Sequence, residues 1–194
     1  MKRILFVNAC IRTDSRTLLL AQEVLRQLDG EIEEVRVSEE NLLPLNRELL
    51  EKRNELLAAR DFSAPMFAYA RQFASADEIV IAAPYWDLSF PSVLRIYLEH
   101  ITITGITFQY SPEGIPEGLC RAERMIYVTT AGGPIGGRNL GFEHVKALAD
   151  AFYGIRDVRC YKAEKLDIEG ADVDGILREA RKEISRMGES VTAD

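Results

Sequence analysis

Cysteine and histidine are scarce in this 194-residue sequence, which holds three cysteines and two histidines. Cys10, Cys120 and Cys160 lie far apart, form no C-x-x-C pair and have no histidine at metal-ligand spacing. This distribution argues against a structural zinc site and a disulfide framework, and it suits a reducing compartment. We therefore expect a cytoplasmic protein without a bound metal, in which Cys120 and Cys160 are packed side chains.

Long apolar runs and an excess of basic residues are also missing. The apolar segment at residues 4–7 is too short for the core of a signal peptide, and no run approaches the length of a membrane span. The net charge of −7 opposes binding to a phosphate backbone, which requires a basic surface. We expect a protein that binds neither membranes nor nucleic acids.

The sequence does contain a regular alternation of strand-like and helix-like segments. Short apolar runs are typical of strands buried in a parallel sheet, and they occur at residues 3–9, 31–37, 78–83, 124–130 and 157–163. The second run has polar positions that indicate one wet side and an edge position. Amphipathic segments predict a helix capped by Asp14 or Ser15 and ended by Gly30. Further helices are predicted at 46–60, 65–75, 91–100, 140–153 and 172–187, with a loop or hairpin at 105–118.

The alternation predicts an α/β fold with one domain. A content of 47% hydrophobic residues suffices for one core, so we expect a single domain over residues 1–187 and a disordered polar tail at 188–194. Five strands with helices between them predict a doubly wound parallel sheet of flavodoxin-like order 2-1-3-4-5, with helices on both faces. Ligands of such sheets bind where the strand order reverses, so the loops after the first, third and fourth strands should form one crevice.

The loop after the first strand has the features of a phosphate site. It offers hydroxyl, guanidinium and backbone N–H donors at the start of a helix, where free amides and the helix dipole attract anions. Its candidate residues are Ser15, Arg16 and Thr17. A purely structural capping role for Asp14 or Ser15 is an equal alternative. The loop lacks G-x-G-x-x-G and G-x-x-x-x-G-K-[ST], which opposes a Rossmann dinucleotide fold and a nucleotide triphosphatase.

The loop after the third strand brings the only tryptophan together with two other aromatic residues, between two stiffening prolines. Tyr85 and Trp86 can stack on a planar ligand, whereas core packing explains Phe90 better. The candidate residues of this loop are Pro84, Tyr85, Trp86, Asp87 and Leu88.

The loop after the fourth strand is rich in glycine, and its candidate residues are Thr130, Ala131, Gly132 and Gly133. Glycine lets the backbone approach a ligand closely, although a flexible turn would have the same composition. A phosphate-type loop, an aromatic loop and a glycine loop at one sheet edge match flavin mononucleotide (FMN), which has a phosphate tail and a flat ring system.

Several motifs occur in one order along most of the chain. They are Ser-Arg-Thr at 15–17, Ala-Pro-Tyr-Trp-Asp-Leu at 83–88, Gly-Ile-Thr-Phe-Gln-Tyr at 105–110, Pro-Glu-Gly-Leu at 116–119, Thr-Ala-Gly-Gly at 130–133 and Tyr-Gly-Ile-Arg-Asp-Val at 153–158. Together they resemble the FMN-dependent NAD(P)H azoreductases and quinone reductases. The resemblance implies an oxidoreductase that passes hydride from NADH or NADPH through FMN to a small acceptor, such as a quinone or an azo compound.

The resemblance also implies roles for single residues. It assigns the FMN phosphate and ribityl chain to Cys10 and residues 15–17, the isoalloxazine edge to residues 85–88, and its pyrimidine end to residues 130–133. Phe108 would lie near the acceptor pocket, and the protein would be a homodimer with a shared active site. Because the flavin carries the chemistry, no catalytic side chain is required.

Two residues depart from the family's pattern. Cys10 stands where serine is usual, and a thiol is a weak hydrogen-bond donor. Asp87 stands where asparagine is usual, and we expect its carboxylate to cap the helix that starts near Pro91 rather than to face the flavin. Residues 134–142 also differ, so the resemblance does not define the acceptor.

Two other functional classes are compatible with a flavin site, namely a flavodoxin-type electron carrier and a non-catalytic flavin-binding partner. The apolar loops and the additional residues at 38–60 argue against the carrier. A phosphodiesterase, an older description of this family, would need metal ligands or a nucleophile with its base, and the sequence offers neither. His100 and His144 fit helix surfaces better than a catalytic site.

Overall fold

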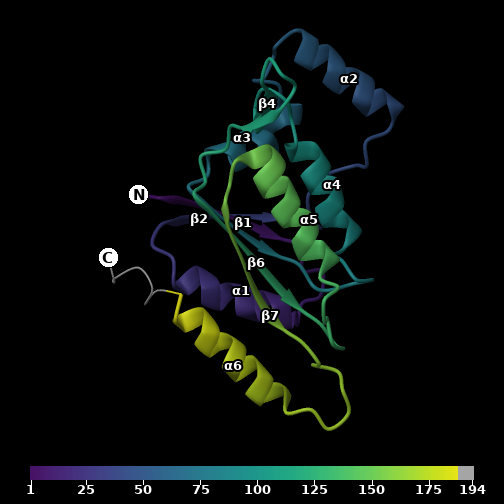
Figure 1. The fold of residues 1–194 in the computed structure, drawn as a ribbon. Coiled ribbons are helices and arrows are strands. Elements are labelled where there is room, and N and C mark those ends of the chain that lie inside the picture. Colours follow the sequence, from purple (N-terminus) through teal and green to yellow (C-terminus); the bar gives the residue numbers. More distant parts are fainter. Residues whose placement is uncertain (188–194) are drawn as a thin grey trace.

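The computed structural model describes residues 1–187, and the polar tail expected at 188–194 lies outside the described residues. Its main sheet has five strands in the order β2-β1-β3-β6-β7, all parallel (Figure 1). These are the five expected strands, so the predicted order 2-1-3-4-5 is confirmed. Their bounds are β1 (Arg3–Asn8), β2 (Glu31–Arg36), β3 (Glu78–Ala82), β6 (Arg124–Thr130) and β7 (Asp157–Ala163).

The apolar content of each strand follows its place in the sheet. All five residues of β3 are buried, and so are the last five of β1 and the last six of β6. Of the six residues of β2, only Val35 is buried. Since β2 is an outer strand, its polar positions face solvent, as the sequence predicted.

Helices cover both faces of the sheet (Figure 1). On one face lie α1 (Arg16–Arg26) and α6 (Val173–Ser185), and on the other α3 (Ala68–Ser75), α4 (Ser92–Ile101) and α5 (Leu140–Leu148). Each face has its own apolar core, in which side chains of β1, β3 and β6 alternate between the two layers. The doubly wound architecture is therefore confirmed.

Helix α2 (Arg47–Ala58) lies apart from these layers and has no buried residue (Figure 1). Its start is fixed by Asn46, whose side chain accepts a hydrogen bond from the amide of Leu49 at 2.9 Å. The prediction of a helix at residues 46–60 is confirmed.

The smaller elements complete the fold. A 3₁₀ turn, η1 (Pro65–Phe67), precedes α3, and a π-helical turn, η2 (Ala149–Tyr153), extends α5. Strands β4 (Phe108–Tyr110) and β5 (Pro116–Gly118) form an antiparallel hairpin. Within residues 1–187, no helix has both the length and the apolar character needed to cross a bilayer.

The register of the sheet aligns the ends of its strands. Asn8 of β1 is opposite Ala82 of β3, and Thr130 of β6 is opposite Ala163 of β7. The loops after β1, β3, β6 and β7 therefore leave the sheet at one edge. Strands β2 and β3, which follow β1 in the chain, lie on opposite sides of it in the sheet. The strand order therefore reverses at β1, and this edge contains the reversal.

Candidate functional site

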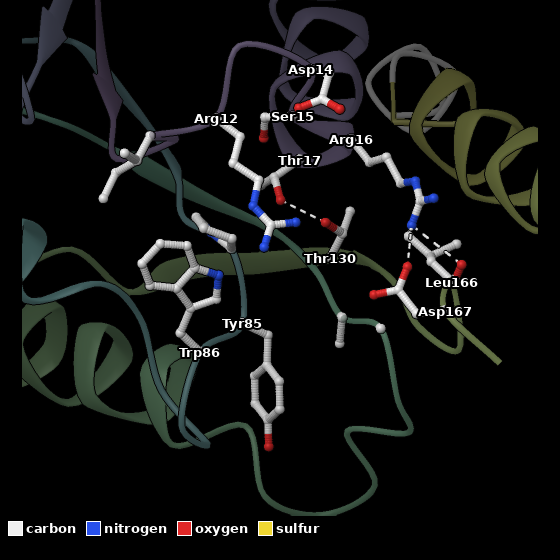
Figure 2. A pocket seen from close by; sticks show the side chains of 14 residues that line it. Arg12, Asp14, Ser15, Arg16, Thr17, Tyr85, Trp86, Thr130, Leu166 and Asp167 are labelled. Carbon is white, nitrogen blue, oxygen red and sulfur yellow. Dashed lines mark hydrogen bonds and ion pairs between the residues drawn. The ribbon is translucent and has the colours of Figure 1, made fainter.

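A cavity of about 330 Å³ lies at this edge, a size in the range of small-molecule sites. Four loops line it: residues 11–12 and 14–17 after β1, 84–86 after β3, 130–132 after β6, and 166–167 after β7 (Figure 2). The three loops predicted from the sequence are therefore brought together. The fourth loop was not predicted, although its place after a parallel strand was the signal that could have identified it.

Helix α1 presents its N-terminus to the cavity. Ser15 is its N-cap, and its hydroxyl accepts a hydrogen bond from the amide of Leu18 at 3.2 Å. Of the two capping candidates, Ser15 is therefore the one used. The amides of Arg16 and Thr17 have no acceptor inside the helix, because the first turn of a helix leaves its N–H groups free. These donors and the positive end of the dipole make this wall suitable for an anion.

Thr17 joins this wall to the end of β6. Its hydroxyl lies 2.6 Å from the hydroxyl of Thr130, and both side chains are buried. A buried hydroxyl pair satisfies two polar groups that would otherwise be costly to desolvate. The bond therefore fixes the first turn of α1 against the start of the glycine-rich loop.

Arg16 is held by the loop after β7. Its guanidinium donates to the carboxylate of Asp167 at 2.7 Å and to the carbonyl of Leu166 at 3.2 Å (Figure 2). No local pattern in the sequence indicates this ion pair, since its partners lie 151 positions apart. Ile11 and Arg12 were not among the predicted site residues, and Asp14 was considered only as a helix cap, yet all three line the cavity.

The glycine-rich loop is pinned rather than flexible. The amides of Lys165, Leu166 and Asp167 donate to the carbonyls of residues 133, 131 and 132. The carboxylate of Glu164 accepts from the amide of Ile135 at 2.6 Å, and this bond lowers the pKa of Glu164. At Gly132, a Cβ atom would overlap the carboxylate of Asp167, so any other residue there would have to displace that side chain. Gly133 is not among the lining residues.

Two aromatic residues form the opposite wall of the cavity. Trp86 is 37% exposed, and the hydroxyl of Tyr85 donates to the carbonyl of Arg138 at 3.0 Å. The amide of Tyr85 donates to the carbonyl of Thr130 at 3.0 Å, which ties this wall to β6. Phe90 instead packs against the core below α5, as predicted.

Asp87 and Leu88 form the tip of a tight turn outside the cavity. Trp86 and Ser89 exchange two backbone hydrogen bonds, of 3.1 and 2.7 Å, and the two central residues have φ of 50° and 66°. Both side chains are exposed, and neither residue lines the cavity. Helix α4 begins with Pro91 as its N-cap and has no side-chain cap, so the expected capping role of Asp87 was wrong. Aspartate suits this position because it tolerates the left-handed conformation better than most residues.

Cys10 and Phe108 lie outside the lining of the cavity. Cys10 is half-buried beside Ala82, and desolvation raises the pKa of its thiol to about 11. Phe108 is 5% exposed and packs edge-on against Phe152, with ring centroids 4.7 Å apart. The chain therefore does not bring Phe108 into its own cavity.

The histidines are also not among the residues that line the cavity. His144 lies against Arg95, with 2.6 Å between the ring nitrogen Nε2 and Nη1, and its pKa is lowered by desolvation and by that positive charge. His100 lies 2.8 Å from the carbonyl of Leu43. Among residues 1–187, no three histidine, cysteine or carboxylate side chains are grouped so that they could hold a metal ion.

Comparisons with known proteins agree with this geometry. The family described as having a flavodoxin-like fold matches residues 2–187. The FMN-dependent NADH:quinone oxidoreductase of Lachnoclostridium phytofermentans is 33% identical over 191 residues, which cover 94% of this chain and 96% of the relative. The enzyme of the same name from Coprothermobacter proteolyticus is 31% identical over 203 residues, covering 96% and 98%.

Solved structures show the same fold. An azoreductase from Bacillus anthracis superposes with a TM-score of 0.85 at 21% identity, over 98% of this chain and 100% of that one. An FMN-dependent NADH-azoreductase from the same species, in complex with FMN, gives 0.82 at 22% identity, over 98% and 99%. The chain therefore belongs to the family with a flavodoxin-like fold that includes the FMN-dependent NADH:quinone oxidoreductases.

Proposed function

We propose that this protein is an FMN-dependent oxidoreductase that transfers hydride from NADH to a small acceptor, a quinone or an azo compound. The observation that carries the proposal is the cavity at the reversal of strand order, where open parallel sheets bind their ligands. The full-length similarity to FMN-dependent NADH:quinone oxidoreductases supports the choice of cofactor and reductant.

The residues of the cavity fit FMN at both ends. The α1 wall offers the free amides of Arg16 and Thr17 and a cationic side chain, Arg12, which are donors that a phosphate requires. The opposite wall offers the rings of Tyr85 and Trp86 to a planar ligand. Between them, Gly132 keeps the backbone free of a side chain.

We assign the cofactor contacts accordingly. Residues 15–17 would hold the phosphate end, residues 84–86 the edge of the ring system, and residues 130–132 its pyrimidine end. Asp87, Leu88 and Gly133 directly follow two of these segments, and Cys10 lies earlier in the same loop as residues 15–17. We propose that these four residues contribute through their backbone. Bound FMN would supply the hydride-accepting and electron-donating chemistry.

The part of the protein in the reaction is to bind, orient and shield the reactants. Among the described residues, no histidine lines the cavity. The two carboxylates that line it are Asp14, just before α1, and Asp167, in the loop after β7 (Figure 2). We therefore assign no side chain as a general acid or base. The fixed walls would hold the reacting rings at short range, which is a large part of the rate enhancement in such reactions.

We further propose a homodimer in which the partner subunit completes each cavity. Phe108, which the family resemblance places near the acceptor, does not line the cavity of its own chain. The hairpin that carries it exposes Tyr110 at 55% and Ile115 at 62%, and grouped exposed apolar side chains are typical of contact surfaces. Sedimentation velocity should give a dimer, and a monomer at all concentrations would contradict this assembly.

A cytoplasmic location without nucleic-acid or membrane partners is also part of the proposal. Its support is the net charge of −7 and the three free, half-buried thiols, which suit a reducing compartment. Fractionation of the producing cells should recover the protein with the cytosol, and recovery with the membranes would contradict it.

The decisive experiment is a binding and turnover assay of the full-length protein. FMN should bind at micromolar concentration or below with quenched flavin fluorescence, and the holoprotein should oxidise NADH when a quinone or an azo dye is present. An electron carrier or a non-catalytic partner would bind FMN without oxidising NADH. Absence of FMN binding would contradict the whole proposal. The same assay with NADPH defines the reductant.

A further inference from the structure

The two arginines at the α1 wall are placed differently toward the cavity. The guanidinium of Arg12 points into the space between α1 and the aromatic wall, whereas that of Arg16 points sideways to Leu166 and Asp167 (Figure 2). Arg12 forms no hydrogen bond or ion pair with any residue that the structure describes. Arg12 is therefore a cation that is directed at the ligand space and has no carboxylate partner among the described residues.

The positive charge of Arg16 is already paired with the carboxylate of Asp167. Its Nη1 atom lies 2.7 Å from the carboxylate of Asp167 and 3.2 Å from the carbonyl of Leu166. A phosphate that approached Arg16 would have to share it with Asp167, and the two anions would repel each other. An arginine in such a contact is better suited to joining two segments than to receiving a ligand.

Asp167 is itself packed against the glycine-rich loop. Its amide donates to the carbonyl of Gly132 at 2.9 Å, and its carboxylate occupies the space that a side chain at position 132 would fill. Arg16 and Asp167 thus connect three segments, the start of α1, the loop after β6 and the loop after β7. Breaking this pair would remove a side-chain link between α1 and the loop after β7, whether or not the flavin carries a phosphate.

We propose that Arg12 is the cation that binds the FMN phosphate, and that Arg16 is a positioning residue which, paired with Asp167, holds the glycine-rich loop against α1. The proposal rests on the proposed function, because it concerns the same cofactor. It assigns specificity for a phosphorylated flavin to Arg12. Asp14, the acidic residue of the α1 wall, lies beside the helix, and the Arg12 guanidinium extends away from it (Figure 2).

The test compares FMN with riboflavin, which has the same ring but no phosphate. Dissociation constants are measured by flavin fluorescence for the full-length apoprotein and for Arg12→Gln, Arg16→Gln and Asp167→Asn. Arg47→Gln removes one positive charge from the exposed helix α2 and serves as the control. Thermal unfolding of each variant verifies that it folds.

Arg12→Gln should weaken FMN binding about ten- to a hundredfold, the range of one charge-assisted hydrogen bond, and leave riboflavin binding within about twofold. It should also reduce the salt dependence of FMN binding. Arg16→Gln and Asp167→Asn should weaken both flavins by the same factor, because both variants release the loop. Arg47→Gln should bind both flavins like the wild type.

The opposite pattern would overturn the inference. If Arg16 received the phosphate, Arg16→Gln would weaken FMN alone and Asp167→Asn would strengthen it. Equal binding of FMN and riboflavin by the wild type would show that no cation recognises the phosphate, while the proposed oxidoreductase function would stand. A wild type that binds neither flavin would instead contradict the proposed function.

Discussion

The α1 wall of the cavity is fixed by side chains, whereas the aromatic wall is fixed by its backbone. On the α1 side, the Ser15 cap, the Thr17–Thr130 pair and the Arg16–Asp167 pair join helix and loops. On the aromatic side, backbone bonds of Tyr85 and the tight turn at residues 86–89 set the shape, and the side chains of Asp87 and Leu88 point to solvent.

The difference has a consequence for substitution. Side-chain contacts fail when one partner is removed, so the α1 wall should respond strongly to single changes in chemistry. A backbone turn responds mainly to changes in φ and ψ preference, so the aromatic wall should tolerate changes of charge.

The largest effect is expected for Ser15→Asp, which places an anion at the proposed phosphate site. At an effective dielectric near 20, two unit charges about 6 Å apart repel by roughly 3 kcal/mol, or about a hundredfold in affinity. Aspartate is as good an N-cap as serine, so the unfolding temperature should change little. FMN titration and thermal unfolding measure the two effects.

Ser15→Asn is the matched control, because asparagine caps the helix without a charge. Its FMN affinity should fall much less than that of Ser15→Asp. Equal losses in the two variants would mean that the phosphate lies elsewhere.

The next effect concerns stability. Thr17→Val leaves the hydroxyl of Thr130 buried without its partner, which should cost about 1–2 kcal/mol of unfolding free energy. The double variant Thr17→Val, Thr130→Val removes both hydroxyls and should recover part of the loss. Urea unfolding of the four proteins of this cycle gives the coupling, and strictly additive losses would exclude the bond.

A smaller effect is expected at the turn of the aromatic wall. Leu88 has φ of 66°, a conformation that costs a side chain with a Cβ atom about 1 kcal/mol. Leu88→Gly relieves this strain in the folded state, but glycine also raises the conformational entropy of the unfolded chain. The variant should therefore be equally stable or up to about 1 kcal/mol more stable than the wild type. Leu88→Ala keeps the Cβ atom and should show no gain. A glycine variant less stable than the alanine variant would contradict strain at this turn.

The smallest effect is expected for Asp87→Asn. The side chain is exposed, lies outside the cavity lining and caps no helix, and asparagine also tolerates positive φ. Unfolding free energy should change by less than about 0.5 kcal/mol, and the flavin potential should move little. A large rise in potential would show that the carboxylate faces the flavin.

The sequence by itself determined the sheet and the place of the site. The apolar runs at β1, β3 and β6 identified buried parallel strands, and the polar positions of β2 identified an edge. Residues 15–17, 84–86 and 130–132 could be assigned to one cavity because topology alone brings the ends of parallel strands to one edge. Local patterns of this kind depend only on neighbours in the chain, and they can therefore be recognised without knowledge of the fold.

Only the tertiary structure decided which way individual side chains turn. The partners of Thr17 and Arg16 lie 113 and 151 positions away, and no local pattern specifies such contacts. The expected cap by Asp87 failed for a local reason, because a tight turn between Trp86 and Ser89 leaves its side chain exposed. Phe108 likewise packs on Phe152 of the helical turn η2, and it does not line the cavity of its own chain. The strand order follows from periodicity and connection, whereas the contacts inside the cavity follow from packing between segments that meet only after the chain has folded.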